Sequence, residues 1–404
     1  MLRIYQPIIR QHLAKFQKMV FLTGPRQIGK TVLSQACTAG YPNVLYLNWD
    51  NIQHKEMILS GIEKIFSQFS TDALQTESRP PIIIFDEIHK YANWKNLLKG
   101  YYDTIKAHCQ IIVTGSAKLN VYRRGGDSML GRYFLYRIHP LTVAEIAGRD
   151  DFKQETIAPK SISTQDWTNL LHYGGFPEPY LQADDNFYQR WSNLKQEQIF
   201  QEDLRELSKI HDLSRLELLA YLLTQQVGST TKYSELAKKA RVTEPTIRHW
   251  IEILRNVYYC FSITPWSQNL SRSLLKEPKI YLWDWSALRD PGARLENLVA
   301  SHLHKAIHFW TDIGLGKYSL HYLRDKDKHE VDFLVTKNQV PWLMVEVKSS
   351  DNTRLSPNLE HFNRQLKVPH VLQVAERLPF VNHDCFELKK PMIVPLQTLL
   401  GQLV

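Results

Sequence analysis

Four short apolar runs mark the first part of the chain. Each run is nearly continuous rather than alternating, and each is followed by a loop or an amphipathic stretch: VFLTG (20–24), NVLYLNWD (43–50), PIIIFDE (81–87) and QIIVTGS (110–116). A continuous apolar run of this length is typical of a parallel strand covered on both faces of its sheet. Residues 1–150 therefore predict an α/β domain whose functional loops lie at the carboxyl ends of the strands.

The hydrophobic pattern becomes more helical after this domain. The stretch FYQRWSNLKQEQIFQEDLRELSKI (187–210) has apolar residues at helical spacing and contains neither Pro nor Gly. We assign residues 151–227 to a helical region, residues 228–270 to a winged-helix-like segment, and residues 271–404 to a C-terminal α/β domain.

Residues 232–259 carry a helix–turn–helix pattern, KYSELAKKARVTEPTIRHWIEILRNVYY. We expect Ser234 to cap the first helix and Thr243 to cap the second, with Pro245 in its first turn. The outer face of the second helix mixes glutamates with arginines, which disfavours sequence-specific reading of DNA bases. Joining domains or binding a protein is the alternative role. The apolar positions share an inner face: Leu236, Ala237, Val242, Ile247, Trp250, Ile251 and Leu254.

The stretch EVDFLVTKNQVPWLMVEVKSS (330–350) reads as a β-hairpin with charged residues inside its strands. Side chains alternate between the two faces of a strand, so a slip of one residue would expose an apolar set. One register opposes Asp332 to Glu346 and Leu334 to Met344. It buries Val331, Phe333, Leu343, Val345 and Val347.

This register has two further consequences. It predicts a turn over Lys337 to Pro341, with Pro341 outside the ladder, where its missing N–H is tolerated. It also brings Asp332, Glu346 and Lys348 together on one face. Two carboxylates and a lysine in this arrangement predict a Mg²⁺ site, and a solvent-exposed ion-pair patch is the alternative.

Composition adds few constraints. The 404 residues are enough for two or three domains, with 43% hydrophobic and 23% charged residues. The net charge of +9 fits a polyanionic partner such as DNA, although a basic protein without one has the same charge. The N-terminus lacks a signal-peptide core, and no apolar run is long enough to span a membrane, so we expect a cytoplasmic protein.

Cysteine and histidine spacing predicts no zinc site. The four cysteines lie far apart and form no CxxC pair, which indicates core positions in a reducing compartment: Cys37, Cys109, Cys260 and Cys385. The histidines of the C-terminal part also lack zinc-ligand spacing, and we expect them at the surface: His302, His304, His308 and His329.

The segment GPRQIGKT fits the phosphate-loop pattern G-x-x-x-x-G-K-[ST] between an apolar strand and a helix-compatible run. Its glycines let the backbone N–H groups wrap a phosphate at the start of the helix. Lys30 would reach the β and γ phosphates of ATP, and the Thr31 hydroxyl would bind Mg²⁺. The predicted ATP-binding residues of the loop are Gly24, Pro25, Arg26, Gln27, Ile28, Gly29, Lys30 and Thr31.

Two later strands end in polar residues. Asp86 and Glu87 close the run PIIIFDE, where Asp86 would hold Mg²⁺ and Glu87 would orient or deprotonate the attacking water. Thr114 and Ser116 close the run QIIVTGS, where a hydroxyl would sense the γ-phosphate. Capping of a following helix is the alternative role of Ser116.

Together these segments resemble AAA-type P-loop ATPases. More narrowly, the chain is similar to a prokaryotic family of predicted ATPases in which an AAA-type domain precedes a C-terminal domain of unassigned role. The resemblance runs from residue 1 to about residue 360. It is carried by TGPRQIGKT, FDEIHKYANWKNLLKGYYD, TGSAK, LGRYFLYRIHPLTVAEI and GGFPEPYL. It implies ATP hydrolysis and makes Arg132 a candidate for stabilising transition-state charge in cis or across an oligomer interface; a structural arginine is the alternative.

The C-terminal hairpin resembles the D…E-x-K pattern of the PD-(D/E)xK, or restriction-endonuclease-like, fold. The resemblance implies metal binding by Asp332 and Glu346, with Lys348 positioning the water nucleophile or steadying the phosphate. Glu296, in the helical run ARLENLVASHLHKAI, would be a further ligand. The proline that usually precedes the first aspartate is replaced by Val331.

The sequence therefore predicts a Mg²⁺-dependent AAA-type ATPase joined to a nuclease-fold domain, acting on or with DNA, with a homo-oligomer as a candidate assembly. The alternative is a non-cleaving regulator in which ATP is the switch and the C-terminal fold binds DNA or protein.

Overall fold

The computed structural model divides the chain into two compact units, Met1–His139 and Pro140–Val404. The predicted limits at residues 150, 227 and 270 remain predictions. The structure describes residues 3–69, 79–116, 129–149, 151, 153–204, 212–267, 277–350 and 354–404. No helix within these residues is long and apolar enough to cross a lipid bilayer. All four cysteines are buried and unpaired, in agreement with the core positions expected.

The first unit is built on a parallel sheet with the strand order β2-β3-β4-β1-β5. The four apolar runs all form strands within one or two residues of their predicted bounds, and β5 is an additional strand. The strands are β1 (Met19–Thr23), β2 (Val44–Asn48), β3 (Ile82–Asp86), β4 (Gln110–Gly115) and β5 (Tyr133–Arg137).

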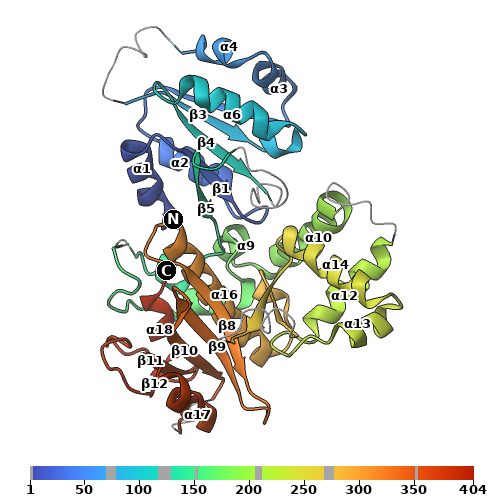
Figure 1. Cartoon of the computed structure of the whole chain (residues 1–404), viewed down its shortest axis with the longest axis vertical. Helices are drawn as coiled ribbons and strands as arrows, with labels where there is room; N and C mark the ends of the chain where they lie inside the picture. The colour runs from blue at the N-terminus through green and yellow to red at the C-terminus, as the bar shows by residue number, and fades with distance from the viewer. Residues whose placement is uncertain are drawn as a thin grey trace. The chain divides into compact units, whose positions relative to one another are not determined.

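Helices cover both faces of this sheet, which explains the continuous apolar runs (Figure 1). Phe21, Phe85 and Val113 pack in one cluster with side chains of α3, α4 and α6. The alternating residues, such as Ile84 and Ile112, are equally buried, and alternation along a strand places them on the other face of the sheet. The helices are α1 (Tyr5–Lys15), α2 (Lys30–Thr38), α3 (Ile52–Leu59), α4 (Ile62–Phe66), η1 (Ile88–Lys90) and α6 (Trp94–Ile105).

The second unit contains a mixed sheet with the strand order β12-β11-β10-β9-β8-β6-β7. Helix α16 (Pro291–Asp312) contacts β7 to β10, and helix α17 (Pro357–Leu366) contacts β9 to β11. The strands are β6 (Cys260–Pro265), β7 (Lys279–Leu282), β8 (Tyr318–Arg324), β9 (Glu330–Lys337), β10 (Val340–Lys348), β11 (His370–Ala375) and β12 (Met392–Pro395).

Smaller helices complete this unit. They are α7 (Val143–Ile146), α8 (Thr164–Tyr173), α9 (Pro177–Gln182), α10 (Asp185–Glu197), the π-helix η3 (Gln198–Asp203), α12 (Leu213–Thr224), α13 (Tyr233–Ala240), α14 (Glu244–Asn256), η4 (Trp285–Ala287) and α18 (Leu396–Gln402).

The predicted helix–turn–helix corresponds to α13 and α14. The Thr243 side chain accepts a hydrogen bond from Thr246 N and caps α14, as expected. The expected cap at Ser234 is wrong, because α13 already begins at Tyr233 and Ser234 lies inside its first turn. On the outer face of α14, Arg248 pairs with Glu244 at 2.7 Å and Arg255 with Glu252 at 2.9 Å.

The hairpin of β9 and β10 has the predicted register in its centre, with Leu334 opposite Met344. The predicted turn is wrong. Asn338 and Gln339, with φ of 50° and 70°, make a tight two-residue turn, and Pro341 pairs with Thr336 inside the ladder. A bulge between Pro341 and Leu343 then absorbs the extra residue.

A second irregularity lies beside Asp332. The β8–β9 register shifts between His321 and Leu323, whose partners are Leu334 and Val331. Asp332 and Phe333 therefore both lie opposite Tyr322. As a result Val331 and Leu334, which regular alternation would place on opposite faces, pack in the same apolar cluster. Val347, predicted to be buried, is only half-buried.

Candidate functional site

The loop between β1 and α2 has a backbone that few sequences could adopt. Gln27 and Gly29 are left-handed, with φ of 59° and 88°. Gly24 approaches Ile138 so closely that a Cβ would overlap the Ile138 carbonyl oxygen. Arg3 Nη1 donates to the Ile28 carbonyl oxygen at 2.9 Å and holds the loop. The first N–H groups of α2 therefore open onto this loop, which is the geometry of an anion site.

Lys30 is the first residue of α2, and its side chain is buried within the loop. Its Nζ donates to the carbonyl oxygens of Gly24 at 3.0 Å and Pro25 at 2.7 Å. The amino group of Lys30 thus lies against the carbonyl groups of its own loop. A phosphate bound at this position would contact both Lys30 and the loop.

Asp86, at the end of β3, accepts hydrogen bonds from three hydroxyl groups. Thr31 Oγ1 donates to Asp86 Oδ2 at 2.8 Å. Tyr46 donates to the same oxygen, and Thr114 donates to Oδ1. Thr114, predicted to sense a phosphate, thus has its hydroxyl on Asp86. A carboxylate beside a threonine hydroxyl is an all-oxygen donor set, which fits Mg²⁺.

Glu87 follows β3 in the left-handed conformation, with φ of 55°. Its N–H donates to the Thr114 carbonyl oxygen at 3.2 Å, and its carboxylate lies 3.7 Å from His89 Nε2. His89 Nε2 in turn lies 3.1 Å from Ser116 Oγ. Burial raises the pKa of Glu87, and the nearby Lys30 opposes the shift. The helix-capping alternative for Ser116 concerns residues outside the described part of the chain.

Arg132 lies just before β5 and forms a two-point ion pair with Asp103 of α6. Its Nε and Nη2 donate to the two carboxylate oxygens, each at 2.9 Å. This arrangement agrees with the structural alternative for Arg132.

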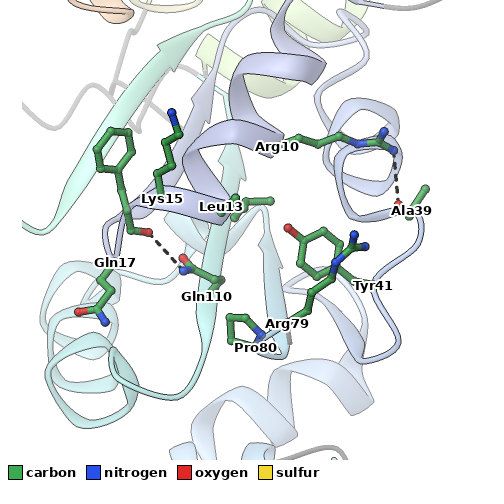
Figure 2. Close-up of a pocket in the computed structure, with 11 residues that line it drawn as sticks. Arg10, Leu13, Lys15, Gln17, Ala39, Tyr41, Arg79, Pro80 and Gln110 are labelled. Atoms are coloured by element: carbon green, nitrogen blue, oxygen red, sulfur yellow. Dashed lines mark hydrogen bonds between the residues drawn. The ribbon is translucent and has the colours of Figure 1, made fainter. Parts of the chain in front are cut away.

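A cavity of about 520 Å³ lies at the amino ends of the strands, whereas the loop between β1 and α2 lies at their carboxyl ends (Figure 2). Arg10 and Arg79 line it, but their guanidinium groups donate to carbonyl oxygens at and after the end of α2, among them Ala36 at 2.9 Å and Gly40 at 3.0 Å. Cations at this position stabilise the negative end of the helix dipole. We therefore assign these arginines a structural role.

In the second unit, Lys279 of β7 lies among carboxylates. Its Nζ is 2.7 Å from Glu330, 3.7 Å from Glu296 and 3.8 Å from Asp332. Although burial opposes its charge, Glu296, Asp332 and Glu330 together raise the pKa of Lys279. Tyr281, two residues further along β7, donates to Glu296 Oε1 at 2.7 Å.

Glu346 and Asp332 come from adjacent strands. Asp332 Oδ2 accepts from Val347 N at 2.9 Å, and Glu346 Oε1 accepts from Lys348 Nζ at 2.7 Å. Glu346 is only 5% exposed, whereas the side chain of its partner Lys348 is 37% exposed. Glu346 Oε2 is buried and finds no hydrogen-bond partner among the residues that the structure describes.

Glu296, Asp332 and Glu346 resist ionisation, since their pKa values are raised. Burial, reinforced by the charge of Asp332, raises the pKa of Glu296 to about 7 and that of Glu346 to about 6. Burial also raises the pKa of Asp332. Gly228, with φ of 78°, packs so closely on Glu296 that a Cβ would lie 2.8 Å from both carboxylate oxygens. Crowded acids and an unsatisfied buried oxygen fit a divalent cation.

Three known families match successive parts of the chain. An AAA domain family (AAA_14) matches residues 16–147. Two domains of unknown function match the rest: DUF8612 at residues 164–290 and DUF4143 at residues 291–386. The first unit has the AAA-type P-loop ATPase fold. The matches support an ATPase family whose C-terminal domain has no assigned function.

Proteins that match most of the chain are distant from it in sequence. An uncharacterized protein of Mycobacterium tuberculosis is 21% identical over 353 residues, 84% of this chain and 72% of the relative. An uncharacterized protein of Methanocaldococcus jannaschii is 23% identical over 376 residues, which are 88% of this chain and 80% of the relative. The Walker-type ATPase PABY2304 of Pyrococcus abyssi is 14% identical with a TM-score of 0.43, over 72% of this chain and 93% of that one.

The sequence missed several residues of both sites. In the first unit these are Arg3 and Tyr46, which reach the site from distant elements, and His89 of η1, the short helix that directly follows Glu87. In the second unit Lys279 was detectable as a charge inside the apolar run KIYLW. The expected surface position of His302 is wrong, since it is fully buried, and His329 joins a group of metal-ligand type.

Proposed function

We propose that the first unit binds and hydrolyses Mg²⁺·ATP. The observation that carries this proposal is the joining of the loop to the acidic strand end, through the hydrogen bond from Thr31 to Asp86. Mg²⁺ supplies charge neutralisation for the phosphates when it is bound with the nucleotide.

The residues of the unit have distinct roles in this proposal. The loop N–H groups and Lys30 bind the phosphates, while Thr31 and Asp86 supply the oxygen ligands for the ion. Glu87 accepts a proton from the attacking water, and its raised pKa makes it a stronger base than an exposed glutamate. Ser116 is held beside Glu87 through His89, where it senses the γ-phosphate.

Nucleotide binding tests the loop directly. We expect Lys30→Ala to weaken binding of a fluorescent ATP analogue by at least ~100-fold, since a buried charge-assisted phosphate contact is lost. Lys64→Ala, a change at an exposed lysine of α4, is the matched control and should bind as wild type. Equal affinity in both variants would exclude the loop as the phosphate site.

We further propose that the second unit is a nuclease-fold domain whose carboxylates bind Mg²⁺ or Mn²⁺. Support comes from the unpartnered Glu346 Oε2 and from the raised pKa values of Glu296 and Glu346. In this proposal Glu296, Asp332 and Glu346 hold the ion, and Lys348 orients the water that attacks a DNA phosphodiester. The net charge of +9 is consistent with a DNA partner.

Cleavage assays test this second proposal. We expect Mg²⁺-dependent nicking of DNA by wild type that is lost in Glu346→Ala and Lys348→Ala. If well-folded, ATP-loaded wild type cuts no form of DNA or RNA, the nuclease proposal fails.

In that case the rival function remains, namely a regulator that ATP switches without cleavage. Arg248 and Arg255 of α14 are paired with glutamates of the same helix. In either case this pairing favours a helix–turn–helix that connects domains over one that binds DNA. Mobility-shift binding of DNA without cleavage would support the rival.

A further inference from the structure

A second group of metal-ligand type lies in the second unit, apart from the carboxylates described above. Asp325 and His329 belong to the connection between β8 and β9, and His361 lies on α17. One ligand atom from each of the three residues lies within 4.8 Å of the other two. Their side chains are partly exposed, at 23%, 42% and 29%, so an ion can reach them from solvent.

The aspartate is oriented by the backbone of its own turn. Asp325 Oδ1 accepts from His329 N at 2.9 Å, and Asp325 N donates to the His329 carbonyl oxygen at 3.1 Å. The other oxygen, Oδ2, therefore points at the two imidazoles. His329 Nδ1 lies 2.8 Å from it and His361 Nε2 lies 2.9 Å from it.

The two imidazoles are held together. Their ring centroids are 4.4 Å apart with an interplanar angle of 29°. Both ring nitrogens point to the same carboxylate oxygen, so each nitrogen must carry its proton there when no ion is bound. Gln365 Nε2 lies 3.0 Å from the same nitrogen, His361 Nε2. The N–H of Gln365 and the N–H of His361 therefore point toward each other when no ion is bound. One cation would replace these protons and accept all the lone pairs at once.

We propose that Asp325, His329 and His361 bind one divalent transition-metal ion, with Zn²⁺ as the best match. Two imidazoles and one carboxylate are a common three-residue zinc set that leaves a fourth position for water. The Gln365 carbonyl oxygen would fill that position after rotation of its amide. Imidazole ligands prefer Zn²⁺, whereas the all-oxygen donors of the carboxylate cluster prefer Mg²⁺ or Mn²⁺.

The site would fasten α17 to the β8–β9 connection, next to the carboxylate cluster. Asn358 of α17 already donates to the Glu330 carbonyl oxygen at 2.9 Å. The Glu330 side chain contacts both Lys279 and Arg324. Zinc binding at Asp325 therefore stabilises the strand that carries Glu330 and Asp332. This role does not depend on the proposed nuclease activity.

Calorimetric titration of tag-free, EDTA-treated full-length protein with ZnCl₂ tests the proposal. We expect one tight Zn²⁺ per wild-type chain, and binding at least ~10-fold weaker in Asp325→Asn and His361→Ala, since even outer contacts of a metal site contribute this much. His172→Ala removes an exposed histidine that pairs with Asp185, and it should bind as wild type. Glu346→Gln should also bind as wild type.

Co²⁺ provides a second readout if His361→Ala loosens α17. Wild type should give a visible ligand-field spectrum that Asp325→Asn lacks and Glu346→Gln keeps. Equal Zn²⁺ affinity in wild type and Asp325→Asn, or loss of binding in Glu346→Gln, would overturn the proposal. So would wild type that binds no Zn²⁺, because the histidines would then only hydrogen-bond the aspartate.

Discussion

The hydroxyl of Thr31 donates a hydrogen bond of 2.8 Å to the carboxylate of Asp86, 55 residues further along the chain. This contact joins the start of α2 to the end of β3, two elements that parallel strand order brings to the same edge of the sheet. Both oxygen ligands expected for Mg²⁺ are thus in place within the protein itself. The predictions about nucleotide binding and hydrolysis by the first unit rest on this contact between Thr31 and Asp86.

Arg132 is expected to be dispensable for catalysis. Both carboxylate oxygens of Asp103 engage its guanidinium, so it is not held ready for a phosphate. We predict that Arg132→Ala keeps ATP affinity and turnover within about 2-fold of wild type, since an exposed ion pair contributes little. A loss of turnover of 100-fold or more, with affinity retained, would instead establish an arginine finger.

Glu346→Gln should stabilise the cation-free protein at pH 8. The pKa of Glu346 is raised from 4.5 to about 6, so the folded state loses stability relative to the unfolded state as the pH rises through this window. Removing the charge should recover roughly 1–2 kcal/mol, since one pKa unit corresponds to ~1.4 kcal/mol.

Thermal unfolding in EDTA and in Mn²⁺ checks this prediction. Wild type should gain melting temperature when Mn²⁺ is added at pH 8, and Glu346→Gln should gain much less. An equal gain in both proteins would place the bound ion elsewhere.

Lys305 of α16 is fully buried and pairs with the equally buried Glu145 of α7. It also donates to Thr142 Oγ1 at 3.1 Å. We predict that Lys305→Met lowers the free energy of unfolding by ~3–5 kcal/mol, because the buried carboxylate of Glu145 loses the ammonium group of Lys305. Urea unfolding of Lys305→Met with Glu145→Gln should show a clearly smaller loss. A double variant as unstable as the single one would assign the effect to packing.

His302 should set part of the acid sensitivity of the second unit. Its Nε2 accepts from Val143 N at 3.1 Å and its Nδ1 donates to the Leu298 carbonyl oxygen at 2.8 Å, which fixes the neutral form. Burial lowers its pKa from 6.5 to about 3. Below pH 6.5 the unfolded chain therefore binds a proton that the folded chain does not, and stability falls by up to ~1.4 kcal/mol per pH unit.

The pH slope of urea unfolding checks this prediction, independently of any constant loss caused by the substitution. His302→Gln should flatten the slope between pH 6.5 and 4, while exposed His172→Gln should leave it unchanged. An unaltered slope in His302→Gln would mean that other groups bind these protons.

The sequence predicted the elements whose cause is local. The strands of the first unit followed from continuous apolar runs, and the phosphate loop followed from its glycines and lysine. The central hairpin pairing of Leu334 with Met344 followed from burial of both apolar sets. Each of these features depends on residues that are close in the chain or on the pairing of two neighbouring strands, so the sequence alone could predict it.

Features that depend on distant partners were missed. The irregularity opposite Tyr322, which lies beside Asp332, was missed because alternation along β9 does not contain it. Lys279 meets Glu330 from another strand, and His361 meets Asp325 from a helix. His361 therefore carried no spacing signal, because it lies 36 residues from Asp325 along the chain.

Phosphate release from ATP, measured in parallel with ATP binding for wild type and Glu87→Gln, tests the central claim most directly. We predict Mg²⁺-dependent turnover by wild type, with binding retained and turnover lowered at least ~100-fold in Glu87→Gln, the range that a general base contributes. Lys30→Ala should lose both binding and turnover. Turnover at the wild-type rate in Lys30→Ala or in Glu87→Gln would contradict the account.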